Sequence, residues 1–157
     1  MKNIKLYKLF IIPLIILSFN CTTKNDKIKE NKKITYDNLI EGDTLEITGK
    51  LICAHCYAFN IENVGIDHHL PKSGFVKDCA IICAKQNYPI AVLLDQPIDS
   101  TKLWIIRTAG DTFANYMTKT LKVKGEYVYR GLIEPTEIKV KKGNDWINLK
   151  IKKSGMM

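Results

Sequence analysis

Residues 43–52, DTLEITGKLI, form the stretch that decides the fold, because apolar and polar side chains alternate along it. This period of two predicts a strand with one buried face and one exposed face. A glycine inside such a strand, here Gly49, predicts a bulge or a bend. The strand runs directly into Cys53, so the first half of a cysteine cluster is expected at a strand end. Its apolar face consists of Leu45, Ile47, Gly49 and Leu51.

Further strand patterns follow along the chain. The stretch after Pro89 is almost wholly apolar and predicts a central strand. Between the third and fourth strands, Gly110 opens a segment with apolar side chains at helical spacing, which predicts a helix through Leu121. The late stretch KVKGEYVYRG contains a glycine, as the first strand does, and the two are expected to pair. The later strands are expected at 90–94, 103–107, 123–129, 137–141 and 146–152.

Five or six short strands with a helix between the third and the fourth are the element order of an OB-like barrel. We therefore predict a mainly β fold with short helices. An open, unclosed sandwich is the competing architecture. Residues 60–74 carry Gly and Pro among polar side chains and are expected to form a loop. Asp78 is expected to cap a short helix over residues 79–86, with Ile81 and Ile82 turned towards the core.

The N-terminus has the pattern of an export signal. Three lysines precede an apolar core, residues 9–17, that is too short to span a bilayer as a mature helix. The sequence LSFNC at residues 17–21 resembles the lipobox of bacterial lipoproteins, which implies a lipidated Cys21; an ordinary secretory signal is the alternative. We predict a signal peptide over 1–20, a lipidated cysteine with a flexible polar tether over 21–35, and one domain over 36–157. The expected location is the bacterial cell envelope, anchored to membrane lipid through Cys21 and facing the periplasm or the cell exterior.

Most of the net charge lies outside the predicted domain. The formal charge is +8, but the leader contributes three lysines and the tether contributes five lysines against two acidic residues. The domain from residue 36 onward carries 16 basic and 14 acidic residues, or +2. Such a small excess does not indicate a nucleic-acid partner, and none is expected. A basic tether is compatible with an anionic membrane surface.

The candidate chemistry lies within residues 53–83. This stretch contains four of the five cysteines and all three histidines of the chain. A Cys-x-x-Cys pair followed by a second close pair is typical of tetrahedral thiolate sites. Sulfur with imidazole favours copper or zinc over magnesium or calcium, and an exported protein makes copper a serious candidate. The candidate ligands are Cys53, Cys56, Cys79 and Cys83, with His55, His68 or His69 replacing or extending them.

Two other interpretations of the cysteines stay open. Small exported domains often carry disulfides, and cross-pairing between the two cysteine pairs would give a stapled interaction module whose partner is an envelope protein or a glycan. A thiol–disulfide redox protein is the second alternative, although no thioredoxin-like βαβ pattern surrounds Cys53. No nucleophilic serine motif, phosphate loop or spaced carboxylate pair stands out, so we expect a binding protein rather than an enzyme.

Three segments, CYAF, DCAIICAKQNYPIAVLLD and LKVKGEYVYRGLIE, together resemble a family of exported, OB-like bacterial proteins of poorly defined function. The resemblance covers about residues 43–152. It implies an OB-like fold more directly than it implies an activity. The matching positions are Cys56 and Tyr57, Cys79 and Ala80, Cys83, and Pro89.

Overall fold

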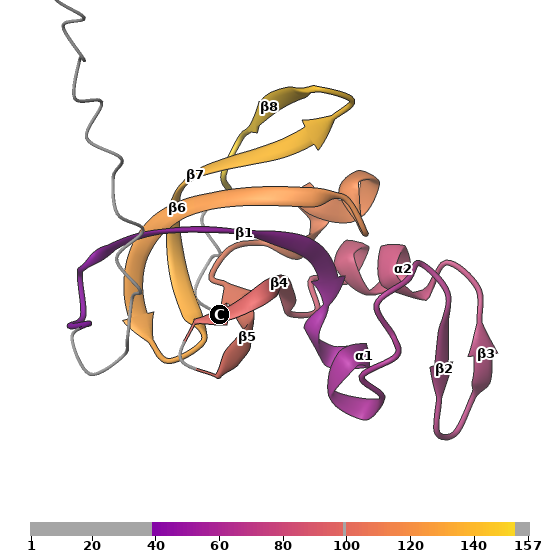
Figure 1. Cartoon of the computed structure of the whole chain (residues 1–157). Helices are drawn as coiled ribbons and strands as arrows, with labels where there is room; N and C mark the ends of the chain where they lie inside the picture. Colours follow the sequence, from indigo (N-terminus) through magenta and orange to yellow (C-terminus); the bar gives the residue numbers. More distant parts are fainter. Residues whose placement is uncertain (1–38, 99, 153–157) are drawn as a thin grey trace, which may run out of the picture. The chain divides into compact units, whose positions relative to one another are not determined.

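The computed structural model of the protein describes residues 39–98 and 100–152 (Figure 1). The chain divides into two units, Met1–Lys32 and Lys33–Met157, and all described residues belong to the second. The predicted signal peptide and Cys21 lie outside the described residues. No helix within the described ranges is long and apolar enough to cross a membrane.

The first strand organises the sheet, because it pairs on both sides. Strand β1 (Thr44–Cys53) is antiparallel to β4 (Ile90–Ile98) along one edge and to β6 (Thr120–Tyr129) along the other. Strand β4 continues to β5 (Thr101–Ile106), and β6 continues to β7 (Leu132–Lys142), which pairs with β8 (Asp145–Leu149). The predicted pairing of the first strand with the late glycine-containing strand is confirmed.

A parallel contact between β5 and β7 brings the two ends of the sheet together, so the sheet nearly closes into a barrel. Around this barrel the strands follow the order β1, β4, β5, β7 and β6, with a 3-10 helix, η2 (Gly110–Tyr116), between β5 and β6. The mainly β, OB-like prediction is therefore confirmed. The predicted helix is shorter and more tightly wound than expected, and Leu121 lies on β6 instead.

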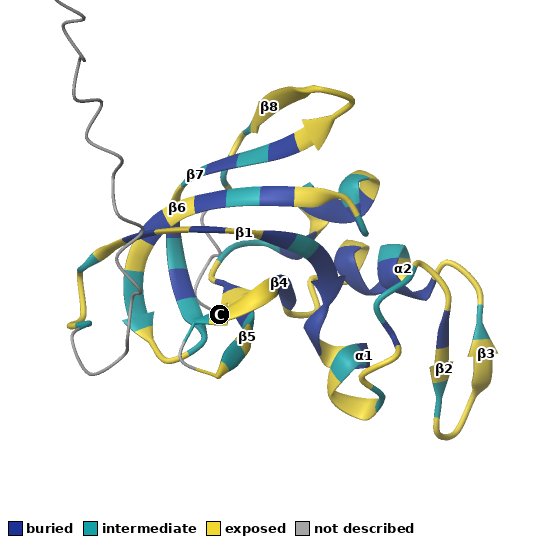
Figure 2. Cartoon of the chain, in the orientation of Figure 1, coloured by how far each residue is buried: buried dark blue, intermediate teal, exposed yellow. Residues whose placement is uncertain are grey.

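The barrel interior holds the core that the alternation predicted (Figure 2). Along β1 the exposed residues alternate with buried ones until Lys50, after which Leu51, Ile52 and Cys53 are all buried. Beyond Lys50 the strand pairs only with β4, and its second face is also buried, because Ile52 packs with Ala54 and Ala91. The largest fully buried side chains include Trp104, Phe113, Leu51, Leu121, Ile133 and Ile138.

Gly49 was predicted to mark a bulge or a bend, and the structure shows no bulge there but a close approach of β4. The pairing of Gly49 with Leu94 continues without a register shift through the rest of β1. A Cβ atom at Gly49 would collide with the backbone carbonyl of Leu93, so the tight curvature of the barrel requires glycine here. Register shifts lie elsewhere in the sheet, between Lys124 and Gly125 and between Tyr127 and Tyr129 on β6, and between Leu93 and Ile98 on β4.

The segment between β1 and β4 forms a small insertion at one end of the barrel (Figure 1). It contains helix α1 (Ala54–Phe59), the hairpin β2 (His68–Leu70) and β3 (Gly74–Val76), and helix α2 (Cys79–Lys85). The expected loop over 60–74 thus holds a strand, which a three-residue pattern among polar residues does not reveal. Ile81 packs against the core as expected, but Ile82 is exposed, because it lies on the outer side of α2.

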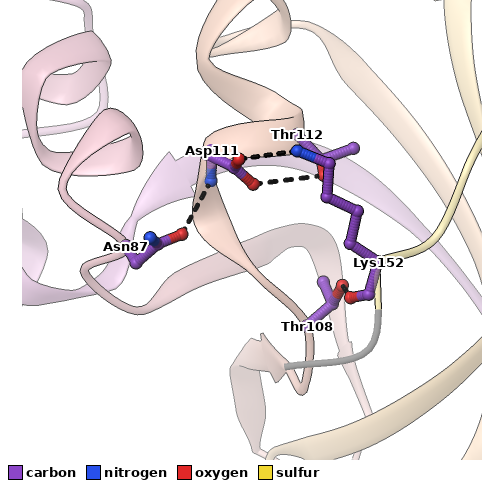
Figure 3. Close-up of polar contacts among 5 residues, drawn as sticks. All are labelled: Asn87, Thr108, Asp111, Thr112 and Lys152. Carbon is purple, nitrogen blue, oxygen red and sulfur yellow. Dashed lines mark hydrogen bonds and ion pairs between the residues drawn. The ribbon is translucent and has the colours of Figure 1, made fainter. Parts of the chain in front are cut away.

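The last described residue is tied back to the barrel (Figure 3). The Lys152 ammonium lies 2.7 Å from Oδ2 of Asp111, and its carbonyl oxygen accepts a hydrogen bond from the Thr108 hydroxyl at 2.7 Å. Asp111 also donates its backbone N–H to Oδ1 of Asn87 at 3.1 Å. These contacts join Lys152 to η2 and, through Asp111, to the turn that leads from α2 into β4.

Candidate metal centre

The end of β1 positions the first cysteine pair. Cys53 is the last residue of the strand and also the N-cap of α1, and its Sγ accepts the backbone N–H of Cys56 at 3.5 Å. The sulfur thus takes the place of the oxygen that usually caps a helix. Because the chain changes from strand to helix at this point, both sulfurs of the Cys-x-x-Cys motif are buried.

Helix α2 positions the second pair. Cys79 and Cys83 are four residues apart and both are buried, which confirms that they share one face of this helix. Asp78 precedes the helix as predicted, in a left-handed conformation and without capping it by its side chain. The Asp78 backbone N–H donates instead to Oδ1 of Asp67 at 2.7 Å.

The two pairs meet at Cys56. Its Sγ lies 3.6 Å from Sγ of Cys79 and 3.6 Å from Sγ of Cys83. Cys53, Cys56, Cys79 and Cys83 are all free thiols in the structure. The insertion between β1 and β4 therefore brings together two cysteine pairs that are far apart in sequence, as their spacing predicted.

His68 is the histidine that joins them. Its side chain is buried, with 1% exposed, on the inner side of β2. Nε2 of His68 lies 3.1 Å from the carbonyl oxygen of Gly65, which can only accept, so Nε2 carries the proton. Nδ1 is buried and has no hydrogen-bond partner among the described residues. In a neutral ring this nitrogen carries a free lone pair, which a metal ion can take up.

The donor atoms fall into two groups of three, and within each group every pair of atoms is at most 4.8 Å apart. One group consists of Cys53, Cys56 and Cys83, and the other of Cys56, His68 and Cys79. All members are buried. A cluster of cysteine and histidine side chains that could hold a metal ion is thus present where the sequence predicted it.

The other two candidate histidines lie outside both groups. His55 is exposed on α1, where its ring packs against Phe59 at 4.9 Å and Tyr88 at 4.7 Å between centroids. His69 is exposed on the outer side of β2 and packs against Phe75 at 5.4 Å. The alternation of a strand sends His68 inward and His69 outward, which their adjacency in sequence does not disclose.

Burial favours the uncharged forms of Cys56, Cys83 and His68. Desolvation raises the pKa of Cys83 to about 12 and raises the pKa of Cys56 still further, so both thiols stay protonated at neutral pH. Desolvation also lowers the pKa of His68, which keeps its imidazole neutral. A metal ion that enters must therefore displace protons from sulfur but not from His68.

Asn63 supports the site and was not recognised in the sequence. Its side chain is 3% exposed, and its amide donates to the carbonyl oxygens of Cys56 and His69, each at 3.0 Å. Its Oδ1 accepts the backbone N–H of His69 at 2.9 Å. Asn63 thus fixes β2 against α1. A lone asparagine in a polar stretch carries no pattern that would mark it as buried.

The comparisons with known proteins assign no relatives: no protein family, no curated protein and no solved structure matches this chain. The function is therefore inferred from the geometry of the cluster.

Proposed function

We propose that this protein is a membrane-anchored protein of the bacterial envelope that binds a soft metal ion, copper or zinc, through its buried cysteine and histidine cluster. The ligands are Cys53, Cys56, Cys79, Cys83 and His68. Thiolate sulfur with imidazole nitrogen selects Cu(I) or Zn(II) over the hard ions that prefer oxygen.

The orphaned Nδ1 atom of His68 is the observation that carries the proposal. A buried nitrogen without a partner is costly, because it has lost its bond to water. A ring nitrogen of His68 belongs to the same group as the sulfurs of Cys56 and Cys79, so an ion bound there would satisfy it. The hydrogen bond from Nε2 to Gly65 is the usual support of a metal-binding histidine, since it fixes the tautomer and the ring orientation.

In the alternative, a disulfide-stapled module, the same cysteine sulfurs would be oxidised in pairs. A disulfide from Cys56 could join it to Cys79 or to Cys83, but not to both, although both sulfurs lie at the same distance. Such a pairing would also leave Nδ1 of His68 without a partner. A single ion bound by several of these donors uses the shared position of Cys56 and satisfies the histidine.

Metal content and thiol counting on the same sample test the proposal. The full chain, purified without chelators, should contain copper or zinc, and removal of the metal should expose four more alkylatable thiols on residues 53–83 after unfolding. His68→Leu should lower metal content, whereas the matched change His69→Leu on the opposite side of β2 should retain it. A metal-free protein whose mass shows two disulfides would overturn the proposal in favour of the stapled module.

Anchoring has a separate test. Cys21→Ala should move the protein from the membrane fraction to the soluble envelope fraction while metal binding by the domain is unchanged. Retention of Cys21→Ala in the membrane fraction would contradict a lipid anchor at this residue and leave the metal site unaffected.

A further inference from the structure

The division of the donors into two overlapping groups limits the number of ions and the kind of ion that they can hold. Five donor atoms are present, but within residues 39–98 and 100–152 no four of them form a group in which all atoms lie within 4.8 Å of one another. Two groups of three exist instead, and Cys56 is the member that they share.

A tetrahedral zinc site needs a different arrangement. With Zn–S bonds of about 2.3 Å, the four sulfurs of a tetrahedron lie about 3.8 Å apart along all six edges. Three donors around a trigonal ion with bonds of similar length lie about 4 Å apart. The structure offers three-donor groups, and the two measured sulfur separations at Cys56, 3.6 Å each, are close to what either shape requires. The number of donors in each group therefore favours an ion that is stable with three ligands.

We infer that the cluster holds two Cu(I) ions bridged by the thiolate of Cys56. One ion is bound by Cys53, Cys56 and Cys83, and the other by Cys56, Cys79 and His68. Monovalent d¹⁰ copper accepts two or three soft ligands, and thiolates bridge such ions readily, whereas structural zinc is almost always four-coordinate. This inference rests on the proposed metal-binding function and adds the oxidation state, the number of ions and the assignment of each ligand.

The loading step balances without a redox partner. Four S–H bonds are replaced by Cu–S bonds, with Cys56 bonded to both ions, and four protons pass to solvent. Copper enters and stays as Cu(I), so nothing is oxidised or reduced. Four thiolates and two Cu⁺ ions leave two negative charges, which the backbone N–H of Cys56, directed at Sγ of Cys53, offsets in part. His68 binds as a neutral imidazole and adds no charge of its own.

A titration of the full chain with Cu(I) tests the inference. The protein, purified in detergent and reduced under argon, is titrated with Cu(I) against a colorimetric Cu(I) chelator, and native mass spectrometry counts the ions bound. We expect two copper ions per chain, and X-ray absorption should show a copper–copper scattering path. Zinc, titrated in parallel, should bind more weakly and without a second ion.

Serine variants assign the ligands. Cys53→Ser and Cys79→Ser each remove a sulfur from one group and should each reduce the count from two ions to one, with loss of the copper–copper path. Cys56→Ser removes the shared sulfur and should lose both ions in competition with the chelator. Circular dichroism and the fluorescence of the buried Trp104 check that each variant is folded.

The outcomes separate this inference from the function on which it rests. One copper ion in the unmodified protein, with no metal–metal path, overturns the two-ion site but leaves a soft-metal protein. Stronger binding of one Zn(II) than of Cu(I) overturns the assignment of copper. No binding of either metal overturns both. Because the ion count of the unmodified chain decides the main point, a variant that fails to fold does not remove the test.

Discussion

The side-chain amide of Asn63 donates to the carbonyl oxygen of Cys56 at 3.0 Å, which links the strand-and-helix junction of the first cysteine pair to the hairpin that carries His68. The same amide binds both the carbonyl oxygen and the N–H of His69. One buried side chain thus sets the distance between two parts of the cysteine and histidine cluster.

Asn63→Ala should therefore weaken both the fold and the metal site. The N–H and the carbonyl oxygen of His69 would lose this partner, while the carbonyl oxygen of Cys56 would keep the Asn60 N–H, and the loss costs about 1–3 kcal/mol in the free energy of unfolding. Urea denaturation of the metal-free protein measures this loss, and the chelator titration should show weaker copper binding. The matched change Asn115→Ala, at an exposed position of η2, should shift stability by less than about 0.5 kcal/mol. Equal stabilities for the two variants would contradict the role of Asn63.

Gly49→Ala should destabilise the barrel although the new side chain is a single methyl group. The added Cβ would meet the carbonyl oxygen of Leu93, so β1 and β4 would have to move apart at a cost of about 1–3 kcal/mol or more. Thermal unfolding followed by circular dichroism measures the change. Gly65→Ala is the control, because its Cβ would lie 3.6 Å from the nearest atom, an ordinary contact. A Gly49→Ala protein as stable as the unmodified chain would show that the barrel is less tightly curved than described.

The metal-free protein should lose stability in alkali. The folded-state pKa of Cys83 is raised from 9.0 to about 12, because burial disfavours the thiolate. Below pH 9.0 the thiol is protonated in both the folded and the unfolded chain. Between pH 9.0 and about 12 the unfolded chain releases the proton first, so rising pH favours unfolding.

Urea midpoints across this pH range check the expected loss in the metal-free protein. Cys83→Ser should make the dependence shallower without abolishing it, because serine does not ionise there but Cys56, whose pKa is also raised by burial, remains. Bound metal should remove the dependence as well, since a coordinated sulfur has already given up its proton. A urea midpoint of the metal-free protein that stays constant over this range would contradict a buried, protonated Cys83.

The ion pair of Lys152 with Asp111 should make the stability of the fold depend on pH in acid rather than in alkali. The hydrogen bond from Lys152 lowers the pKa of the Asp111 carboxyl below its ordinary value of 3.8. The pair therefore stabilises the fold above that value and stops doing so as the pH falls through the lowered pKa. Because both side chains are largely exposed, the effect should be small and should shrink in high salt.

Asp111→Asn tests this pair by thermal unfolding. The variant should melt slightly lower than the unmodified chain at neutral pH, and the difference should vanish in acid. A difference that persists at acid pH would contradict the ion pair as its source and would point instead to the hydrogen bond that the Thr112 hydroxyl donates to Oδ1 of Asp111 (Figure 3).

The strands could be predicted from the sequence because burial on one face of a sheet imposes a period of two. The alternation of residues 43–52 therefore disclosed β1, and the order of strands and helix disclosed the OB-like barrel. The hairpin of β2 and β3 could not be predicted in this way, because three-residue strands are too short to show a period. Gly49 indicated a bulge or a bend, whereas the close approach of the Leu93 carbonyl, which requires glycine there, depends on how β4 packs against β1.

The cysteines of the site were predictable for a similar reason, since Cys79 and Cys83 share a helix face at a spacing of four. Which histidine joins them was decided by the tertiary structure alone. His68 and His69 are adjacent residues of the same type, so the sequence does not distinguish them. The hairpin turns His68 into the interior and leaves His69 exposed. The side chain of Asn63 fixes that hairpin through contacts with residues 56 and 69. Contacts between separate elements produce no periodic pattern in the sequence, so they could not be predicted from it. Sequence spacing determined which sulfurs could meet, whereas the packing of the insertion decided which histidine would lie beside them.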